Sequence, residues 1–190
     1  MEALKERILR DGKNLGRGIL KVDGFINHQV DPVLMMEAGR ELAACFRSVG
    51  ATKVLTAEIS GIAPALTTAL ELGIPLLYAR KTKPVTMTEP VFVEAAPSHT
   101  KGMSVFLMAS PEFLTPEERI LIIDDFLASG QTIHALVRMV QHAGAELVGI
   151  GALIEKAFEG GRTDLEPLGV PLYALAVIAE MTDDQIIFAD

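Results

Sequence analysis

The segment LIIDDFLASGQT, residues 121–132, combines residue types that can bind a phosphorylated sugar. An apolar strand-like run leads to two carboxylates, and after a short turn small and hydroxyl residues open a stretch with helical spacing. The start of a helix leaves backbone N–H groups unpaired and carries partial positive charge, so residues 128–132 can wrap a phosphate. The hydroxyls of Ser129 and Thr132 add donors, and Gly130 allows close approach because it has no side chain. The second half of the segment therefore predicts a phosphate loop.

Asp124 and Asp125 come just before that loop. In open α/β sheets ligands bind at the carboxyl ends of parallel strands. We therefore expect both carboxylates at a solvent-facing strand end, directed toward whatever the loop holds. Carboxylate oxygens accept hydrogen bonds from sugar hydroxyls. Together the two parts predict recognition of a ribose that carries a 5-phosphate.

Each of these residues also has a purely structural interpretation, because Asp, Ser and Gly are ordinary cap and turn residues. The whole ordered string is far more specific than any one position. No Gly-Lys-Ser/Thr follows, which excludes a Walker-type loop, and no G-x-G-x-x-G follows a strand as in a dinucleotide site. A sugar-phosphate site is the interpretation that accounts for the complete string.

Helical and strand-like periods alternate along the chain, and residues 121–132 join one predicted strand to the helix that follows it. The first ten or so residues predict a short amphipathic helix ended by Gly12. Asp31 caps a second helix, which begins at Pro32 and continues toward Gly50. The remaining predicted elements are helices at residues 63–72 and 131–143 and strands at residues 53–57, 74–78, 120–123, 147–154 and 172–178.

Strands that are nearly continuous apolar runs, alternating with amphipathic helices, are typical of a parallel sheet covered on both faces. We predict a doubly wound α/β fold in which residues 1–190 form one domain and residues 1–31 a small N-terminal hood. Prolines interrupt residues 82–111, where two β-prone runs flank the polar stretch SHTKG. This region is expected to be a hairpin with a mobile tip.

The bulk composition favours small-molecule chemistry. At 190 residues and 49% apolar content the chain can build its own core, and it shows neither a signal-peptide core nor an apolar run of membrane-spanning length. A cytosolic location is therefore expected. A formal net charge of −8 without a long Lys/Arg run argues against a nucleic-acid partner. The lone Cys45 lies among apolar neighbours and is expected to serve packing.

DDFLASGQT resembles the phosphoribosyl pyrophosphate motif of the type I phosphoribosyltransferases. The stretches MEALKERI, LKVDGFINHQVDPVLM, EISGIAP, YARK and GIGALIEKAFEGGR extend the similarity over nearly the whole chain, toward the bacterial members that use xanthine. The resemblance implies the type I fold with a flexible hairpin lid, a homodimer, and purine salvage. The implied reaction joins xanthine to the ribose 5-phosphate of phosphoribosyl pyrophosphate, giving xanthosine 5′-monophosphate and pyrophosphate. It also implies Mg²⁺ bound mainly by the substrate's oxygens, without an assigned protein ligand.

The resemblance assigns roles residue by residue. The sugar-phosphate set is Asp124, Asp125, Ala128, Ser129, Gly130, Gln131 and Thr132. The pyrophosphate set is Glu58, Ile59, Ser60, Gly61, Arg80 and Lys81, with Lys101 reaching it from the closing lid. The xanthine set is Leu20, Asn27 and Lys156. Because Glu-Ile-Ser-Gly replaces the Ser-Ser-Gly typical of the pyrophosphate loop, backbone amides rather than the Ile59 side chain are expected to act there.

Two points of function remain open in the sequence. Relatives that use hypoxanthine and guanine carry an acid where this chain has Ala128, so no general acid is assigned, and Lys156 and Asn27 are expected to carry more of the base recognition. The alternative from another class is a purine-sensing transcription regulator that reuses this ligand domain. Such a regulator needs a DNA-binding module, and about thirty residues before Asp31 offer little room and few positive charges for one.

Overall fold

The computed structural model describes residues 1–97, 104–182 and 185–189. Its centre is a six-stranded sheet with the strand order β10-β9-β8-β7-β3-β4. Neighbouring strands run parallel except at one edge, where β10 is antiparallel to β9. The bounds are β3 Lys53–Ala57, β4 Leu76–Ala79, β7 Arg119–Leu127, β8 Glu146–Lys156, β9 Leu172–Met181 and β10 Ile186–Phe188.

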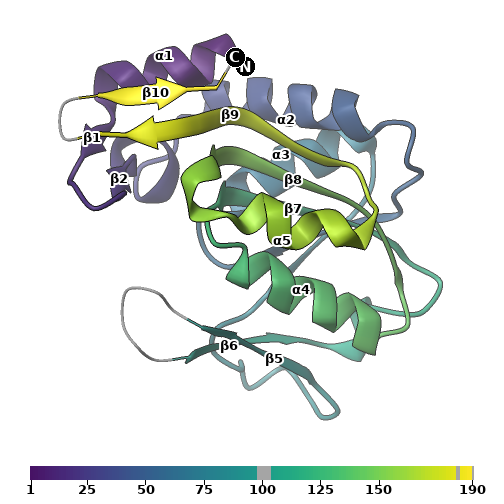
Figure 1. Cartoon of the computed structure of the whole chain (residues 1–190). Coiled ribbons are helices and arrows are strands. Elements are labelled where there is room, and N and C mark those ends of the chain that lie inside the picture. The colour runs from purple at the N-terminus through teal and green to yellow at the C-terminus, as the bar shows by residue number, and fades with distance from the viewer. Residues whose placement is uncertain (98–103, 183–184, 190) are drawn as a thin grey trace.

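Helices cover both faces of this sheet (Figure 1). The helices α1 (Glu2–Asp11), α2 (Pro32–Phe46) and α3 (Ile62–Leu72) pack on one face, and α4 (Gln131–His142) and α5 (Gly161–Leu165) lie on the other. Short turns of 3-10 helix are η2 Pro111–Phe113, η3 Ala157–Glu159 and η4 Glu166–Leu168. The predicted α/β fold with a sheet covered on both faces is confirmed. Within the described residues no helix has both the length and the apolar character needed to cross a membrane.

The central strand β7 shows why both faces must be covered. Leu121 and Ile123 pack into the core beneath α2 and α3, whereas Ile120 and Ile122 pack into the core beneath α4. All four side chains are fully buried. Side chains of a strand alternate between the two faces, so a continuous apolar run fills two cores at once.

Strand β7 is longer than its apolar run predicts. It continues through both aspartates to Leu127 and remains paired with β8, with Asp124 opposite Ala152 and Phe126 opposite Ile154. Phe126 and Leu127 resume the apolar pattern after the two charges, so the ladder is not broken where the charges begin. The aspartates therefore lie within the strand, whereas the sequence had led us to expect them at its end.

The residues between α1 and α2 form two short elements whose buried side chains join the core beneath α2 and α3. The hairpin of β1 (Lys13–Asn14) and β2 (Leu20–Lys21) is followed by a π-helical turn, η1, over Asp23–Asn27. Neither element was predicted, because strands of two residues and a single turn of five residues are too short to show a period. The assignment of residues 1–31 as a hood on a single domain stays a prediction.

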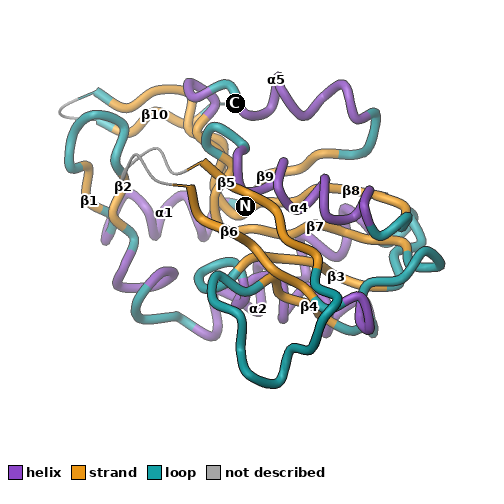
Figure 2. Tube along the Cα trace, turned by 90° about the horizontal axis from the view of Figure 1, so that it is seen from below, coloured by secondary structure: helices purple, strands orange, loops and turns teal. Residues whose placement is uncertain are grey.

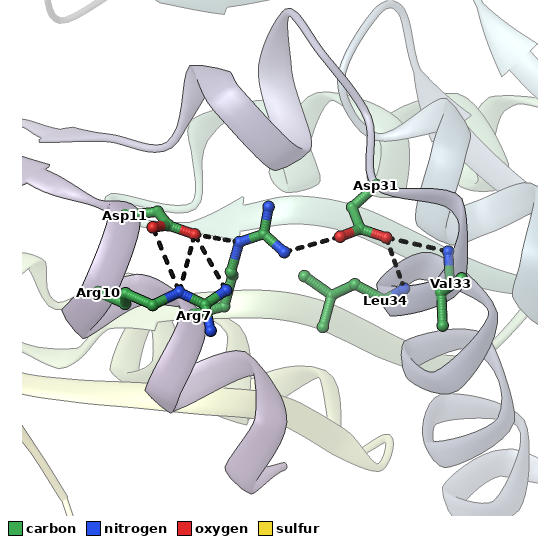
Figure 3. A network of polar contacts seen from close by, with 6 residues as sticks. All are labelled: Arg7, Arg10, Asp11, Asp31, Val33 and Leu34. Carbon is green, nitrogen blue, oxygen red and sulfur yellow. Dashed lines mark hydrogen bonds and ion pairs between the residues drawn. The ribbon is translucent and has the colours of Figure 1, made fainter.

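A polar network ties the first helix to the second (Figure 3). Arg7 contacts Asp11 within α1 at 2.5 Å and Asp31 at 2.7 Å. The Asp31 carboxylate also accepts hydrogen bonds from the amides of Val33 and Leu34, which makes it the predicted N-cap of α2. The Leu34 amide, followed by Arg7, lowers the pKa of Asp31.

The predicted hairpin is formed by β5 (Phe92–Pro97) and β6 (Ser104–Ala109), shown in Figure 2. On its inner side the buried Glu94 carboxylate contacts Arg138 at 2.9 Å and His142 at 2.6 Å, both on α4. Main-chain hydrogen bonds between Arg80 and Met108 join the hairpin to the chain after β4. The contacts of Glu94 hold the hairpin against α4, and the bonds of Met108 hold it beside the end of β4. Its expected lid tip, including Lys101, lies outside the described residues.

Candidate active site

The site lies where the chain reverses its direction of winding across the sheet. From β3 the chain passes through α3 to β4 on one side, and from β7 it passes through α4 to β8 on the other. A crevice opens at such a switch point between the carboxyl ends of the two central strands, here β3 and β7. The loops after β3, β4, β7 and β8 all meet at this edge.

The loop after β7 has the form of an anion cradle. Gly130 is the N-cap of α4 and adopts a left-handed conformation with φ of +75°, which a side chain would disfavour. Within the described part of the chain, the amides of residues 129–132 donate no hydrogen bond. Four unpaired donors at the start of a helix are suited to a phosphate. They line a cleft of about 340 Å³ that Ala96, Val105 and Leu107 of the hairpin wall on the other side.

The loop after β3 faces a second, smaller hollow of about 80 Å³. The Glu58–Ile59 peptide bond is cis, and the Ile59 side chain is exposed. The Glu58 amide donates to the Ala79 carbonyl at 3.0 Å, so it is not available to a ligand. Among the described residues, no acceptor faces the amides of residues 59–61. Of the amides described in this loop, only these three are therefore available for the expected binding of pyrophosphate by the backbone.

The two expected cations after β4 differ in their surroundings. The Glu58 carboxylate contacts the Arg80 guanidinium at 3.1 Å and accepts a hydrogen bond from the Lys81 amide at 2.6 Å. Arg80 is therefore already paired with a carboxylate. Lys81 lines both hollows, and no described carboxylate forms an ion pair with its ammonium group. Lys81 is the cation that the geometry leaves available to a bound anion.

Asp124 and Asp125 are unlike each other. The Asp124 side chain is 6% exposed, whereas Asp125 is only half-buried. The sequence-based expectation that both face solvent is therefore wrong for Asp124. Burial, and then the neighbouring Asp125 charge, raise the pKa of Asp124 well above its usual range. Gly61 packs directly on it, because a Cβ there would be 2.6 Å from the Asp124 Oδ1 atom.

A larger cleft of about 1000 Å³ opens on the other side of the phosphate loop. Lys156, the last residue of β8, lines it; its ammonium contacts Glu159 at 3.2 Å and lies 5.5 Å from the centre of the Phe126 ring. Ala128 and Ser129 line both this cleft and the cleft of about 340 Å³, which we call the phosphate cleft, so the two adjoin at this loop. The other lining residues are Arg17, Gly18, Ile19, Phe158, Glu159, Glu180 and Met181.

The structure does not bring the other two expected base contacts into this cleft. Leu20 is buried in the core that also holds residues of α2 and α3, and Asn27 is exposed at the end of the π-helical turn. Their contact with a purine stays a prediction. The residues that line the cleft instead, Arg17 and Phe158 among them, were not singled out from the sequence. Only the two glycines beside Arg17, a turn signal, could have drawn attention to its segment.

Comparison with known proteins adds the following findings. The sequence model of the family described as "Phosphoribosyl transferase domain" matches residues 35–167. The xanthine phosphoribosyltransferase of Lactobacillus delbrueckii subsp. bulgaricus is 48% identical over 188 residues, which cover 99% of this chain and 100% of the relative. The protein of the same name from Deinococcus deserti is 50% identical over 183 residues, 96% of this chain and 95% of the relative. The crystal structure of adenine phosphoribosyltransferase from Rhodothermus marinus superposes with a TM-score of 0.75 at 25% identity, over 94% of this chain and 100% of that one.

Proposed function

This chain belongs to the phosphoribosyltransferase family, and we propose that it serves purine salvage by joining xanthine to the phosphoribosyl group of phosphoribosyl pyrophosphate. The observation that carries the proposal is identity of 48–50% to two relatives named xanthine phosphoribosyltransferase, over almost their whole length. That similarity includes the N-terminal residues, which the family match over residues 35–167 leaves out. Likeness to adenine phosphoribosyltransferase at 25% identity supports the fold more than the choice of base.

The phosphate cleft is the proposed site of the sugar phosphate. The free amides of residues 129–132, with the Ser129 and Thr132 hydroxyls, would hold the 5-phosphate. Asp125 would accept hydrogen bonds from a ribose hydroxyl, and Asp124 from the other. The Asp124 carboxylate already accepts a hydrogen bond from the Asp125 amide at 3.0 Å, and a ribose hydroxyl would be its second polar partner in this buried position.

The second hollow accounts for the leaving group. The amides of residues 59–61 and the Lys81 ammonium would stabilise charge as pyrophosphate leaves the sugar. The remaining oxocarbenium-like sugar is attacked by the base nitrogen, so the protein must hold both substrates in line and exclude water. The hairpin already walls the phosphate cleft. We propose that its tip closes over the site and brings Lys101 to the pyrophosphate.

Magnesium fits this cleft only with help from the substrate. Within the described residues, no three His, Cys, Asp or Glu side chains gather as a ligand set. Asp124 and Asp125 are the carboxylates of the cleft, and Mg²⁺ usually keeps oxygen ligands from phosphates and water besides one or two carboxylates. We therefore propose that phosphoribosyl pyrophosphate supplies most of its ligands. When bound, the ion would neutralise charge on the leaving pyrophosphate.

Base choice is proposed to rest on Lys156. Xanthine has carbonyl oxygens at C2 and C6 and loses a proton more readily than guanine or hypoxanthine, so a cation favours it. The Lys156 ammonium offers three donors and would exchange its Glu159 contact for the base. Adenine presents an amino donor where xanthine has an acceptor, which would leave buried polar groups unpaired. Leu20 and Asn27 are proposed to approach the base when the N-terminal residues move onto it.

We also propose a homodimer in the cytosol. The exposed apolar side chain of Ile59 lies on the pyrophosphate loop, and those of Leu66 and Leu70 lie on α3, the helix that follows this loop. A second copy of the chain would bury them. A dimer mass in light scattering at micromolar concentration is expected, and a monomer would contradict this part of the proposal.

One assay tests the function. Purified protein is supplied with phosphoribosyl pyrophosphate, magnesium and, separately, xanthine, guanine, hypoxanthine or adenine. The highest kcat/KM is expected for xanthine, and adenine is expected to be a very poor substrate. Transfer that favours adenine would overturn the base assignment. Binding of phosphoribosyl pyrophosphate without transfer to any base would favour the ligand domain of a transcription regulator.

A further inference from the structure

The segment after β8 contacts the phosphate loop through Gly161. The Gly161 amide donates a hydrogen bond to the Ala128 carbonyl at 3.0 Å. A Cβ at Gly161 would lie 2.3 Å from the Ala128 oxygen, 2.7 Å from the Gly130 nitrogen and 2.8 Å from the Ser129 carbonyl carbon. All three are backbone atoms of the loop that faces the 5-phosphate.

The contact is one of backbone against backbone. On the other side, a Cβ at Gly130 would meet Gly161 first, with its Cα at 3.4 Å. Gly130 is the left-handed N-cap of α4, so its conformation sets the direction of the amides that follow. A side chain at position 161 could not be accommodated by a change of rotamer nearby. It would have to displace the phosphate loop itself.

An ion pair between the half-buried Arg162 and the buried Glu155 holds Gly161 in this place. The next residue, Arg162, donates from Nε and Nη2 to the two carboxylate oxygens of Glu155 at 2.8 and 2.5 Å, and from Nη1 to the Leu172 carbonyl at 3.3 Å. Glu155 is 1% exposed, near the end of β8. The Glu155 hydrogen bond is the main reason that the pKa of Arg162 is raised. A bidentate pair of this kind fixes orientation as well as distance.

The same short stretch carries the base-side cation, because Lys156 directly follows Glu155. We propose that residues 155–162 form a brace in which Gly161, held by the Glu155–Arg162 pair, positions the phosphate loop relative to Lys156. Gly161 and the pair touch no substrate and act through the loop as positioning residues. The inference rests on the proposed function for the identity of the ligand, a 5-phosphorylated ribose. Its geometry is independent of which base is used.

Gly161→Ala tests the brace, with Gly24→Ala as the matched control. A Cβ at Gly24 has no atom within 4 Å, and Gly24 has no positive φ. Ribose 5-phosphate binding is measured by calorimetry, and kcat and both KM values by the transfer assay. Because a displacement near 1 Å can cost about 100-fold, Gly161→Ala is expected to lower kcat/KM for phosphoribosyl pyrophosphate by about that factor. Ribose 5-phosphate affinity should fall in parallel, with a smaller change in the KM for xanthine.

Arg162→Lys is a second variant that keeps the test valid if Gly161→Ala does not fold. It keeps the positive charge beside Glu155 but loses the two-pronged contact, so a smaller loss of ribose 5-phosphate affinity is expected, at a melting temperature close to that of Gly24→Ala. Equal affinity in Gly161→Ala, Arg162→Lys and Gly24→Ala would overturn the brace. Failure of the unaltered protein to transfer phosphoribose to any base would contradict the proposed function instead, and the ribose 5-phosphate comparison would still decide the brace.

Discussion

The phosphate side and the base side of the site are built in different ways. On the phosphate side the polar groups that would face a ligand come from two short segments, residues 58–61 and 124–132, and from Lys81, while the hairpin adds an apolar wall. The base side is collected from residues 17–19, 128–129, 156–159 and 180–181. Of the residues that the structure describes, only 128–129 belong to both. A phosphate can be held by consecutive amides of one chain segment, whereas a planar base needs side chains from several directions.

The largest loss of activity is expected from changes to the two aspartates of the phosphate side. We expect the double change Asp124→Asn with Asp125→Asn to reduce kcat/KM for phosphoribosyl pyrophosphate by about 1000-fold, since each hydrogen bond to a charged group is worth about 2 kcal/mol. The melting temperature should not fall, because the change removes a buried carboxyl. Steady-state kinetics and a thermal melt check both statements. Activity within a few-fold of the unaltered protein would refute the ribose assignment.

Gly61→Ala should have the next largest effect. The added Cβ would lie 2.3 Å from the Thr56 Oγ1 atom and 2.6 Å from the Asp124 Oδ1 atom, both of which are buried. The pyrophosphate loop would have to move, with a loss of about 100-fold in kcat. Gly24→Ala, with open space around its Cβ, is the control. Unchanged turnover in Gly61→Ala would mean that this loop does not hold the leaving group.

Lys156→Gln tests the base side with a smaller, selective effect. The glutamine keeps a donor but not the charge, so kcat/KM for xanthine should fall about tenfold more than that for hypoxanthine. The KM for phosphoribosyl pyrophosphate should change little, which is the contrast with the two variants of the phosphate side. Equal losses for both bases would show that Lys156 is not the discriminating residue.

The smallest effect concerns stability and pH. Because the folded state raises the pKa of Asp124, the unfolded chain releases this proton at a lower pH than the folded protein does. The free energy of unfolding therefore decreases as pH rises from about 4, the ordinary range of an Asp, toward the raised value. The asparagine side chain of Asp124→Asn does not titrate in this range. The free energy of unfolding of the variant, measured relative to that of the unaltered protein in urea melts, should therefore increase from pH 4 to pH 7. A decrease of this difference as pH rises would contradict the burial argument.

The same contrast explains how far the sequence could lead. The phosphate loop and the helix α4 were predictable, because a helix start and its free amides are properties of consecutive residues. Five of the six strands were predictable, and β10 was missed. The strands β7, β8 and β9 run beyond the ranges predicted from their apolar runs, β7 because Phe126 and Leu127 continue the strand after the two charges. Burial of Asp124 depends on Gly61, which packs on it from another loop. The placing of Phe158 and Arg17 in one cleft likewise depends on packing between distant segments.

A crystal structure with xanthosine 5′-monophosphate tests the central claim most directly, that one nucleotide bridges the two sides across residues 128–129. The phosphate should lie within hydrogen-bond distance of the amides of residues 129–132. A ribose hydroxyl should contact Asp125, and the base should contact the Lys156 ammonium, which will have left Glu159. A nucleotide whose base lies outside the cleft lined by Phe158, with Lys156 still on Glu159, would contradict the account.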